Sequence, residues 1–298
     1  MSGTGSTLAC RALGRELRRL RARARLQQAE AARLSETSPQ SIGRMEDGQY
    51  TRITSFQVNA LCNAYGATDA ERELVLALLE EAKAVHKGRA GSAWWRGFAD
   101  EIPSDFNHYI SLEDSANRLT ILATDLVPGL VQIPEYRRVL AWAENPTWTP
   151  EEVDRRMQVA TNRQQRLQDP DFRLDVFLTS AVLENWVGSD AVMREQLLRL
   201  VEISKLPNVS IRVVPRRALD PIGPLVSSFS LLEFPALPSS KLQEPPVVYV
   251  EGYVGDLYVE GTDEIAQYRS AVDRIGRVAL DLVRSREAIL KAAEEYKE

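Results

Sequence analysis

Residues 26–48, LQQAEAARLSETSPQSIGRMEDG, constrain the fold more than any other part of the sequence. Leu26-Gln27-Gln28 opens a short helix that ends near Leu34, and a turn is expected at 35–37. Ser38 can cap a second helix, because its hydroxyl can accept a backbone N–H of the first turn. Pro39 suits the next position, where a missing N–H costs nothing.

The second helix of this pair has one apolar face and one polar face. Ile42 and Met45, three residues apart, form the buried side. Gly48 suits the left-handed position that ends a helix. Two short helices joined by so short a turn form the unit that lays its second helix in the major groove of DNA. The polar face of that helix carries Gln40, Ser41, Gly43 and Arg44.

This segment resembles the phage-repressor-like (Xre) helix-turn-helix family over roughly residues 8–80. The matching positions are Gln28, Ala32 and the ending Ile42…Glu46-x-Gly48. The stretch LGRELRRLRARARL, just before the helix pair, resembles the first helix of this family. The resemblance implies an ion pair between Arg21 in that helix and Glu46 at the end of the second helix of the pair. Gly43 departs from the family pattern, which has serine or a larger residue there. Glycine also costs about 1 kcal/mol relative to alanine within a helix.

The arrangement predicts which side chains contact duplex DNA. Gln40 and Arg44 are expected to contact bases, since Gln pairs bidentately with adenine and Arg with guanine. Smaller base contacts are expected from Ser41 and Pro39. Contacts to the DNA backbone are expected from Gln28, Gln49 and Arg52.

Charge is distributed unevenly along the chain. Residues 1–52 hold ten arginines and five carboxylates, a net charge of +5, whereas the whole chain carries −5. A basic end on an acidic body is expected of a protein that grips phosphates with one face. An arginine-rich helix that is merely solvated is the alternative interpretation.

Length and composition exclude several classes of protein. A chain of 298 residues with 44% hydrophobic content can form two or more domains with real cores. No apolar run is long enough to span a membrane and no signal peptide is evident, so a cytoplasmic protein without membrane contact is expected. Cys10 and Cys62 lack the spacing of a metal site. We therefore expect neither a metal nor another cofactor.

The sequence predicts three segments. Helices at 54–66 and 69–86 complete an all-α helix-turn-helix bundle over 8–86. The small and polar residues 87–93 are expected to form a linker. From 94 to 298, strand candidates bunch together between helices, so we expect an α+β domain with a largely antiparallel sheet. Its elements are expected at 119–123, 150–168, 172–178, 190–204, 209–214, 227–234, 247–251 and 257–260, with one closing helix at 263–294.

This second half resembles the uncharacterised regulatory domain that follows Xre-type domains in many actinobacterial regulators. The matching motifs include Val127-Pro128-Gly129-Leu130-x-Gln132-x-x-x-Tyr136, Arg163-Gln164 and Tyr249-Val250-Glu251. Two places depart from the pattern, Ser180 and the segment 215–224. If that segment lines a ligand site, this chain's ligand differs from that of its relatives or is absent.

Catalysis is not expected. The two histidines, His86 and His108, are poorly placed for a nucleophile with a base, and no glycine-rich phosphate loop is present. A cluster of aromatic residues offers a possible small-molecule pocket, although a plain hydrophobic core is the commoner use of such residues. The cluster consists of Trp94, Trp95, Phe98, Phe106 and Tyr109.

Three functional hypotheses follow. The leading one is a transcriptional regulator that binds double-stranded DNA as a homodimer on an inverted repeat. The second, which the resemblance to this regulator family implies, is an antitoxin-like module that binds a small acidic partner protein, with DNA binding used for autoregulation. The third is a sensor gated by a small-molecule effector in the α+β domain.

Overall fold

The computed structural model describes residues 7–87, 94, 98, 104–218, 220 and 222–297. The chain divides into two compact units. The first comprises Met1–Ser115 together with Pro235–Glu244, and the second comprises Ala116–Phe234 together with Pro245–Glu298. The predicted linker falls outside the described residues except for Lys87, which ends the fifth helix.

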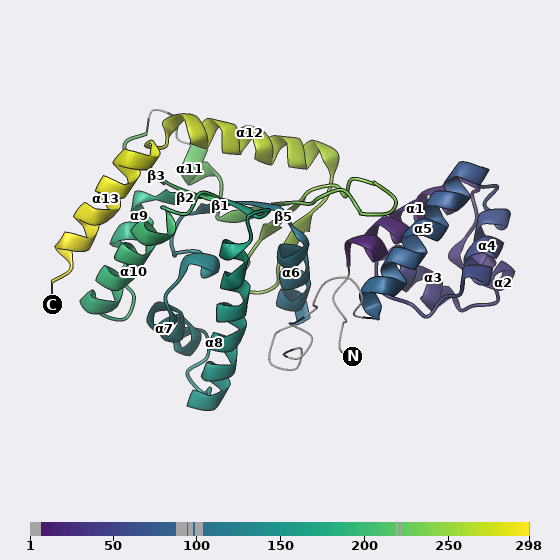
Figure 1. The fold of residues 1–298 in the computed structure, drawn as a ribbon, viewed down its shortest axis with the longest axis horizontal. Coiled ribbons are helices and arrows are strands. Elements are labelled where there is room, and N and C mark those ends of the chain that lie inside the picture. Colours follow the sequence, from purple (N-terminus) through teal and green to yellow (C-terminus); the bar gives the residue numbers. More distant parts are fainter. Residues whose placement is uncertain are drawn as a thin grey trace. The chain divides into compact units, whose positions relative to one another are not determined.

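Helices make up the first unit. Four of them begin after a threonine or serine whose hydroxyl accepts a backbone N–H, at Thr7, Ser38, Thr54 and Thr68. The helix α1 packs against both α3 and α5. The all-α bundle predicted for the N-terminal part of the chain is therefore present. The helices are α1 (Leu8–Arg23), α2 (Gln28–Leu34), α3 (Pro39–Glu46), α4 (Ser55–Ala64), α5 (Asp69–His86) and α6 (Ser104–Ser115) (Figure 1).

A six-stranded sheet forms the centre of the second unit, with strand order β3-β2-β1-β4-β5-β6. The strands are β1 (Arg118–Ala123), β2 (Arg173–Thr179), β3 (Val209–Val214), β4 (Phe229–Glu233), β5 (Val247–Val250) and β6 (Leu257–Val259). The helices are η2 (Gly129–Val131), α7 (Pro134–Glu144), α8 (Pro150–Gln164), η3 (Gln165–Gln168), α9 (Ser180–Glu184), α10 (Asp190–Ile203), α11 (Ile222–Leu225), α12 (Thr262–Val278) and α13 (Leu282–Glu295).

The α+β class is confirmed, but the sheet is mixed and not largely antiparallel. Strands β1, β2 and β3 are parallel to one another, whereas β4, β5 and β6 add antiparallel neighbours. The reason lies in the connections. Helices α7 and α8 separate β1 from β2, and α9 and α10 separate β2 from β3, so each pair is joined by the helical crossover that parallel strands require.

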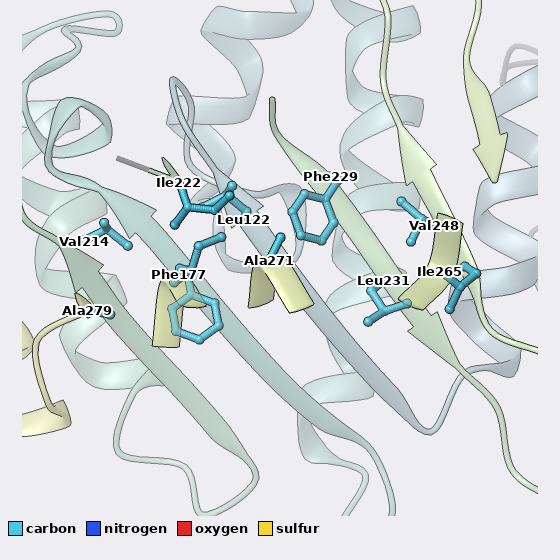
Figure 2. Packing of buried hydrophobic residues seen from close by; sticks show 11 residues of the cluster. Leu122, Phe177, Val214, Ile222, Phe229, Leu231, Val248, Ile265, Ala271 and Ala279 are labelled. Atoms are coloured by element: carbon cyan, nitrogen blue, oxygen red, sulfur yellow. The ribbon is translucent and has the colours of Figure 1, made fainter. Parts of the chain in front are cut away.

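Helices cover both faces of the sheet, with α12 on one face and α7, α8 and α10 on the other (Figure 1). The core beneath α12 joins Phe177, Phe229, Leu231 and Val248 from the strands to Ala271 from the helix (Figure 2). Strand β1 is buried on both faces for five of its six residues. The strand expected at 119–123 is therefore present without one polar face, because a central strand covered on both faces has no polar side.

The single closing helix predicted over 263–294 is two helices, α12 and α13. The break falls at Leu280, whose backbone N–H donates to the Val213 carbonyl of β3 at 2.9 Å. Asp281 then caps α13 by accepting the Arg284 N–H at 2.9 Å. The edge strand thus takes the hydrogen bond that would have continued the helix.

Candidate nucleic-acid interface

The helix α3 has an apolar underside and clear ends. Ile42 and Met45 are buried in the bundle. At its start, the Ser38 hydroxyl accepts the Ser41 N–H at 3.1 Å, and Pro39 occupies the first turn. At its end, Gly48 has a φ of 72°, the left-handed conformation expected from the sequence. These features fix which side of α3 faces outward.

A buried carboxylate at the last residue of α3 anchors the helix. Glu46 accepts two hydrogen bonds from the Arg21 guanidinium, from Nε at 2.6 Å and from Nη2 at 2.9 Å. It also accepts one from the Gln28 amide at 3.0 Å. The hydrogen bonds to Glu46 raise the pKa of Arg21 above its usual value. The predicted Arg21–Glu46 pair is thus present, and it ties α1 and α2 to α3.

Close packing of α1 on α3 depends on Gly14. A Cβ at this position would lie 2.2 Å from the Met45 carbonyl oxygen, far inside van der Waals contact. The absence of a side chain therefore lets the two helix backbones touch. Because this contact and the Glu46 network hold the same end of α3, the outer face of the helix is a rigid surface.

The outer face presents the residues expected to contact bases. Pro39, Gln40 and Arg44 are exposed. Arg44 Nε donates to the Gln49 side-chain oxygen at 3.2 Å, so Gln49 orients the guanidinium. The Ser41 hydroxyl lies 2.9 Å from that of Ser38 and completes the N-terminal cap. Gln40 and Arg44 therefore offer the amide and guanidinium groups suited to base edges.

Two of the residues assigned to the DNA backbone have different surroundings. Gln28 is half-buried and its amide nitrogen is engaged by Glu46, so its first role is to support α3. Its amide oxygen would lie 3.5 Å from a Cβ at Gly43, which shows that the α2 side chain lies against this glycine. Arg52 is exposed just beyond α3.

The ten arginines of residues 7–52 fall into two groups, which the sequence alone did not separate. The six arginines on α1 all make ion pairs within the unit. In contrast, four exposed arginines make no ion pair among the residues that the structure describes. These are Arg25, Arg33, Arg44 and Arg52. A count of charge along the sequence could not reveal this division, since the partners Glu71 and Glu244 are remote in sequence.

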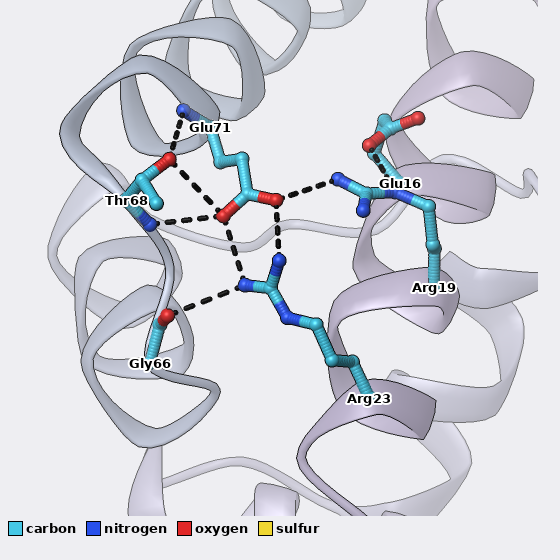
Figure 3. Close-up of polar contacts among 6 residues, drawn as sticks. All are labelled: Glu16, Arg19, Arg23, Gly66, Thr68 and Glu71. Atoms are coloured by element: carbon cyan, nitrogen blue, oxygen red, sulfur yellow. Dashed lines mark hydrogen bonds and ion pairs between the residues drawn. The ribbon is translucent and has the colours of Figure 1, made fainter.

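A cluster around Glu71 joins the C-terminal half of α1 to the start of α5 (Figure 3). Arg23 donates to both Glu71 oxygens, at 2.6 and 2.8 Å, and Arg19 adds a third bond at 3.0 Å. The Thr68 N–H donates to the same carboxylate at 2.9 Å. The hydrogen bonds from Arg23, Thr68 and Arg19 lower the pKa of Glu71 well below its usual value.

Two protein-family models match the chain. A helix-turn-helix domain model matches residues 12–75. A second model, the domain of unknown function DUF5753, matches residues 106–291, which is more than half of the chain. The chain belongs to the DUF5753 family. No curated protein and no solved structure matched the chain.

The helix-turn-helix match shows that this DUF5753 protein is a DNA-binding regulator. Within the described ranges, no helix is both long enough and apolar enough to span a membrane. Across the same residues, His, Cys, Asp and Glu side chains form no group of three or more that could hold a metal ion.

Polar side chains from α7, α8 and α10 stabilise the turn at 127–133. The Gln164 amide donates to the Gln132 carbonyl at 2.7 Å, and the Tyr136 hydroxyl accepts the Val127 N–H at 3.3 Å. Gln196, buried in α10, accepts the Ile133 N–H at 2.7 Å. These polar residues therefore satisfy backbone groups of a turn that has few regular hydrogen bonds.

The predicted aromatic pocket is only partly within the described residues, since Trp95 lies outside them. Trp94 packs edge-on against Phe98, with ring centroids 6.3 Å apart, and its indole donates to Asp114 at 3.0 Å. Phe106 stacks on Tyr109 at 5.7 Å. These four aromatic residues contact one another in pairs, as expected of packing residues.

Proposed function

We propose that this protein is a sequence-specific transcriptional regulator of the Xre type that reads DNA with α3. The observation that carries the proposal is the outer face of α3, where Gln40 and Arg44 stand exposed on a helix fixed by the buried Glu46 network. A rigid helix with amide and guanidinium groups at its surface can discriminate base edges in the major groove.

We further propose that the protein binds an inverted repeat as a homodimer. One short helix reads only a few base pairs, and specific affinities near 10⁻⁸ M or better usually need two half-sites about one helical turn apart. A two-fold protein dimer matches this requirement. The DUF5753 domain would then contribute dimerisation, partner binding or sensing, and it would act by binding and not by catalysis.

Base reading is tested by replacing Arg44 with alanine. A bidentate contact to guanine contributes about 1–3 kcal/mol of discrimination. We expect Arg44→Ala to lower the preference for the best operator over a variant changed at one base pair by about tenfold or more. Gln40→Ala should relax the preference at a neighbouring base pair. The measurement is a selection from random duplexes followed by titration of the preferred sequence and its single-base variants.

Arg33→Ala provides the matched control. It also removes an exposed arginine, but from α2, which carries no residue expected to contact bases. We expect it to weaken binding to all duplexes equally. If Arg44→Ala behaves like Arg33→Ala, α3 does not read bases and the proposal is wrong.

A further inference from the structure

The segment between β4 and β5, Pro235–Glu244, clusters with the first unit, although its sequence lies within the DUF5753 match. It has an ordered fold. The Leu237 N–H donates to the Leu242 carbonyl and the Lys241 N–H to the Leu237 carbonyl, each at 2.9 Å. An isolated bridge joins Ala236 to Gln243. We call residues 235–244 the strap.

One end of the strap is fixed to α1 by a fully buried carboxylate. The Glu244 side chain has 0% exposure and accepts both Nη atoms of Arg15, at 2.9 and 2.8 Å. Arg11 Nε adds a third bond at 3.1 Å, and its side chain is only 9% exposed. A buried carboxylate is tolerated when it is paired in this way, and it becomes costly when its partners are removed.

The strap is also fixed to α5, with the roles of donor and acceptor reversed. Glu81 of α5 accepts the Ser240 N–H at 3.2 Å and the Ser240 hydroxyl at 3.3 Å. It also accepts the backbone N–H of Ser239. The helix bundle thus supplies cations from α1 and an anion from α5, and the strap supplies the matching partner to each.

The two ends of the strap continue almost at once into the sheet. β4 ends at Glu233 and β5 begins at Val247. Leu231 and Val248 on these strands are part of the core beneath α12 (Figure 2). At the other side, α1 is the helix whose Gly14 touches α3. A short stretch of chain therefore connects the family domain's core to the helices that support the recognition helix.

We propose that the strap is a coupling device through which the DUF5753 domain controls the helix-turn-helix unit. A change that displaces β4 and β5 is transmitted through Glu244 and Glu81 to α1 and α5, and so to the support of α3. The consequence for DNA affinity rests on the function proposed above. The consequence for the stability of α1 and α5 does not.

The first test is hydrogen exchange of the full-length protein. Glu244→Gln keeps the shape but removes the charge that Arg11 and Arg15 share. We expect exchange of α1 and α5 amides to rise about ten- to a hundredfold, a range that allows for Arg15 being 38% exposed. Lys241→Gly is the control, since Lys241 is exposed on the same strap with a φ of 57°. Equal exchange in the two variants would overturn the proposal.

The second test asks whether the strap transmits a change from the sheet. Leu231→Ala should loosen β4. Leu174→Ala should loosen β2, which β1 separates from β4 in the sheet, so it serves as the control; both leucines are buried. We expect only Leu231→Ala to speed exchange in α1 and α5, by about tenfold, and we expect Glu244→Gln combined with Glu81→Gln to abolish that response. An equal effect of the two leucine variants, or a response that persists when both carboxylates are replaced, would show that coupling does not run through the strap.

A milder variant and a DNA titration complete the design. Glu81→Gln weakens only the attachment of the strap to α5, so it replaces Glu244→Gln if that variant does not fold. We expect it to raise amide exchange in α5 more than in α1. In full-length protein with operator DNA, Glu244→Gln should weaken binding severalfold. If the wild-type protein selects no DNA sequence, the proposed function is wrong. The hydrogen-exchange results would still decide whether the strap couples the sheet to α1 and α5.

Discussion

Arg25 and Glu36 hold a backbone conformation that usually belongs to glycine. Arg25, between α1 and α2, has a φ of 57°, and Glu36, between α2 and α3, has a φ of 51°. Side chains with a Cβ are strained there, and such strain often accompanies function. Arg25 is also one of the four exposed arginines without an ion pair in the described part of the first unit.

Substitution of each residue by glycine separates strain from charge. We expect Arg25→Gly and Glu36→Gly to raise the free energy of unfolding by similar amounts, about 0.5–1 kcal/mol, because both relieve the same strain. Their effects on DNA should be opposite. Arg25→Gly removes a cation and should weaken binding severalfold, whereas Glu36→Gly removes an anion beside α3 and should strengthen it.

Chemical denaturation and DNA titration of the two variants provide the measurements. If both variants are more stable than the wild type while Arg25→Gly binds DNA more weakly and Glu36→Gly more tightly, Arg25 contacts phosphate. If both variants shift the affinity in the same direction, the charge of Arg25 has no part in binding.

At the scale of elements, we expect the contact between α1 and α5 to weaken in acid. The pKa of Glu71 is lowered from its ordinary value of 4.5 by Arg23, Thr68 and Arg19. A carboxylate with a lowered pKa contributes stability that is complete above its unfolded-state pKa and is lost as the pH falls through its folded-state pKa. The helical unit should therefore lose stability below about pH 4.5.

Glu71→Gln tests this assignment. We expect the variant to be less stable than the wild type at pH 7 and to show a flatter decline between pH 5 and the onset of acid unfolding. Glu73→Gln, an exposed carboxylate on the same helix, should leave the curve unchanged. The measurement is thermal unfolding at a series of pH values, and an unaltered slope in Glu71→Gln would rule out this carboxylate as the source.

The sequence predicted helices better than strand directions. Ser38, Pro39 and Gly48 act over a few residues, so the ends of α3 could be inferred from local rules. The sheet could not, because β1 is buried on both faces and shows no alternation. The break before α13 depends on Val213, which is far away in sequence. Features that depend on remote partners leave no local signal.

The candidate site shows the same division. Gln40 and Arg44 were accessible to sequence reasoning, since the position of a side chain on a short helix follows from its periodicity. The engagement of Gln28 by Glu46 was not predicted, because both α2 and α3 must be placed before it becomes visible. The pairing of Arg11 and Arg15 with Glu244 joins residues more than two hundred positions apart.

For the whole molecule, the two groups of arginines predict the salt dependence of DNA binding. Each chain has four exposed arginines without an ion pair in the described residues, so the proposed dimer would release about eight counterions. The logarithm of the DNA association constant should then fall with the logarithm of the salt concentration with a slope no steeper than about −7. If all ten arginines of residues 1–52 contacted phosphate, the slope would approach about −18. Titration between 50 and 200 mM salt, a range in which this dependence is readily measured, distinguishes the two.

The strap has a consequence for how this protein can be divided and engineered. Residues 8–86 are contiguous in sequence, yet Arg11 and Arg15 find their counterion in Glu244, which a gene cut after residue 87 would discard. The helices expressed alone would carry these two guanidinium groups without the matching carboxylate. A fragment or chimera made from this chain therefore has to include residues 235–244 together with the helices.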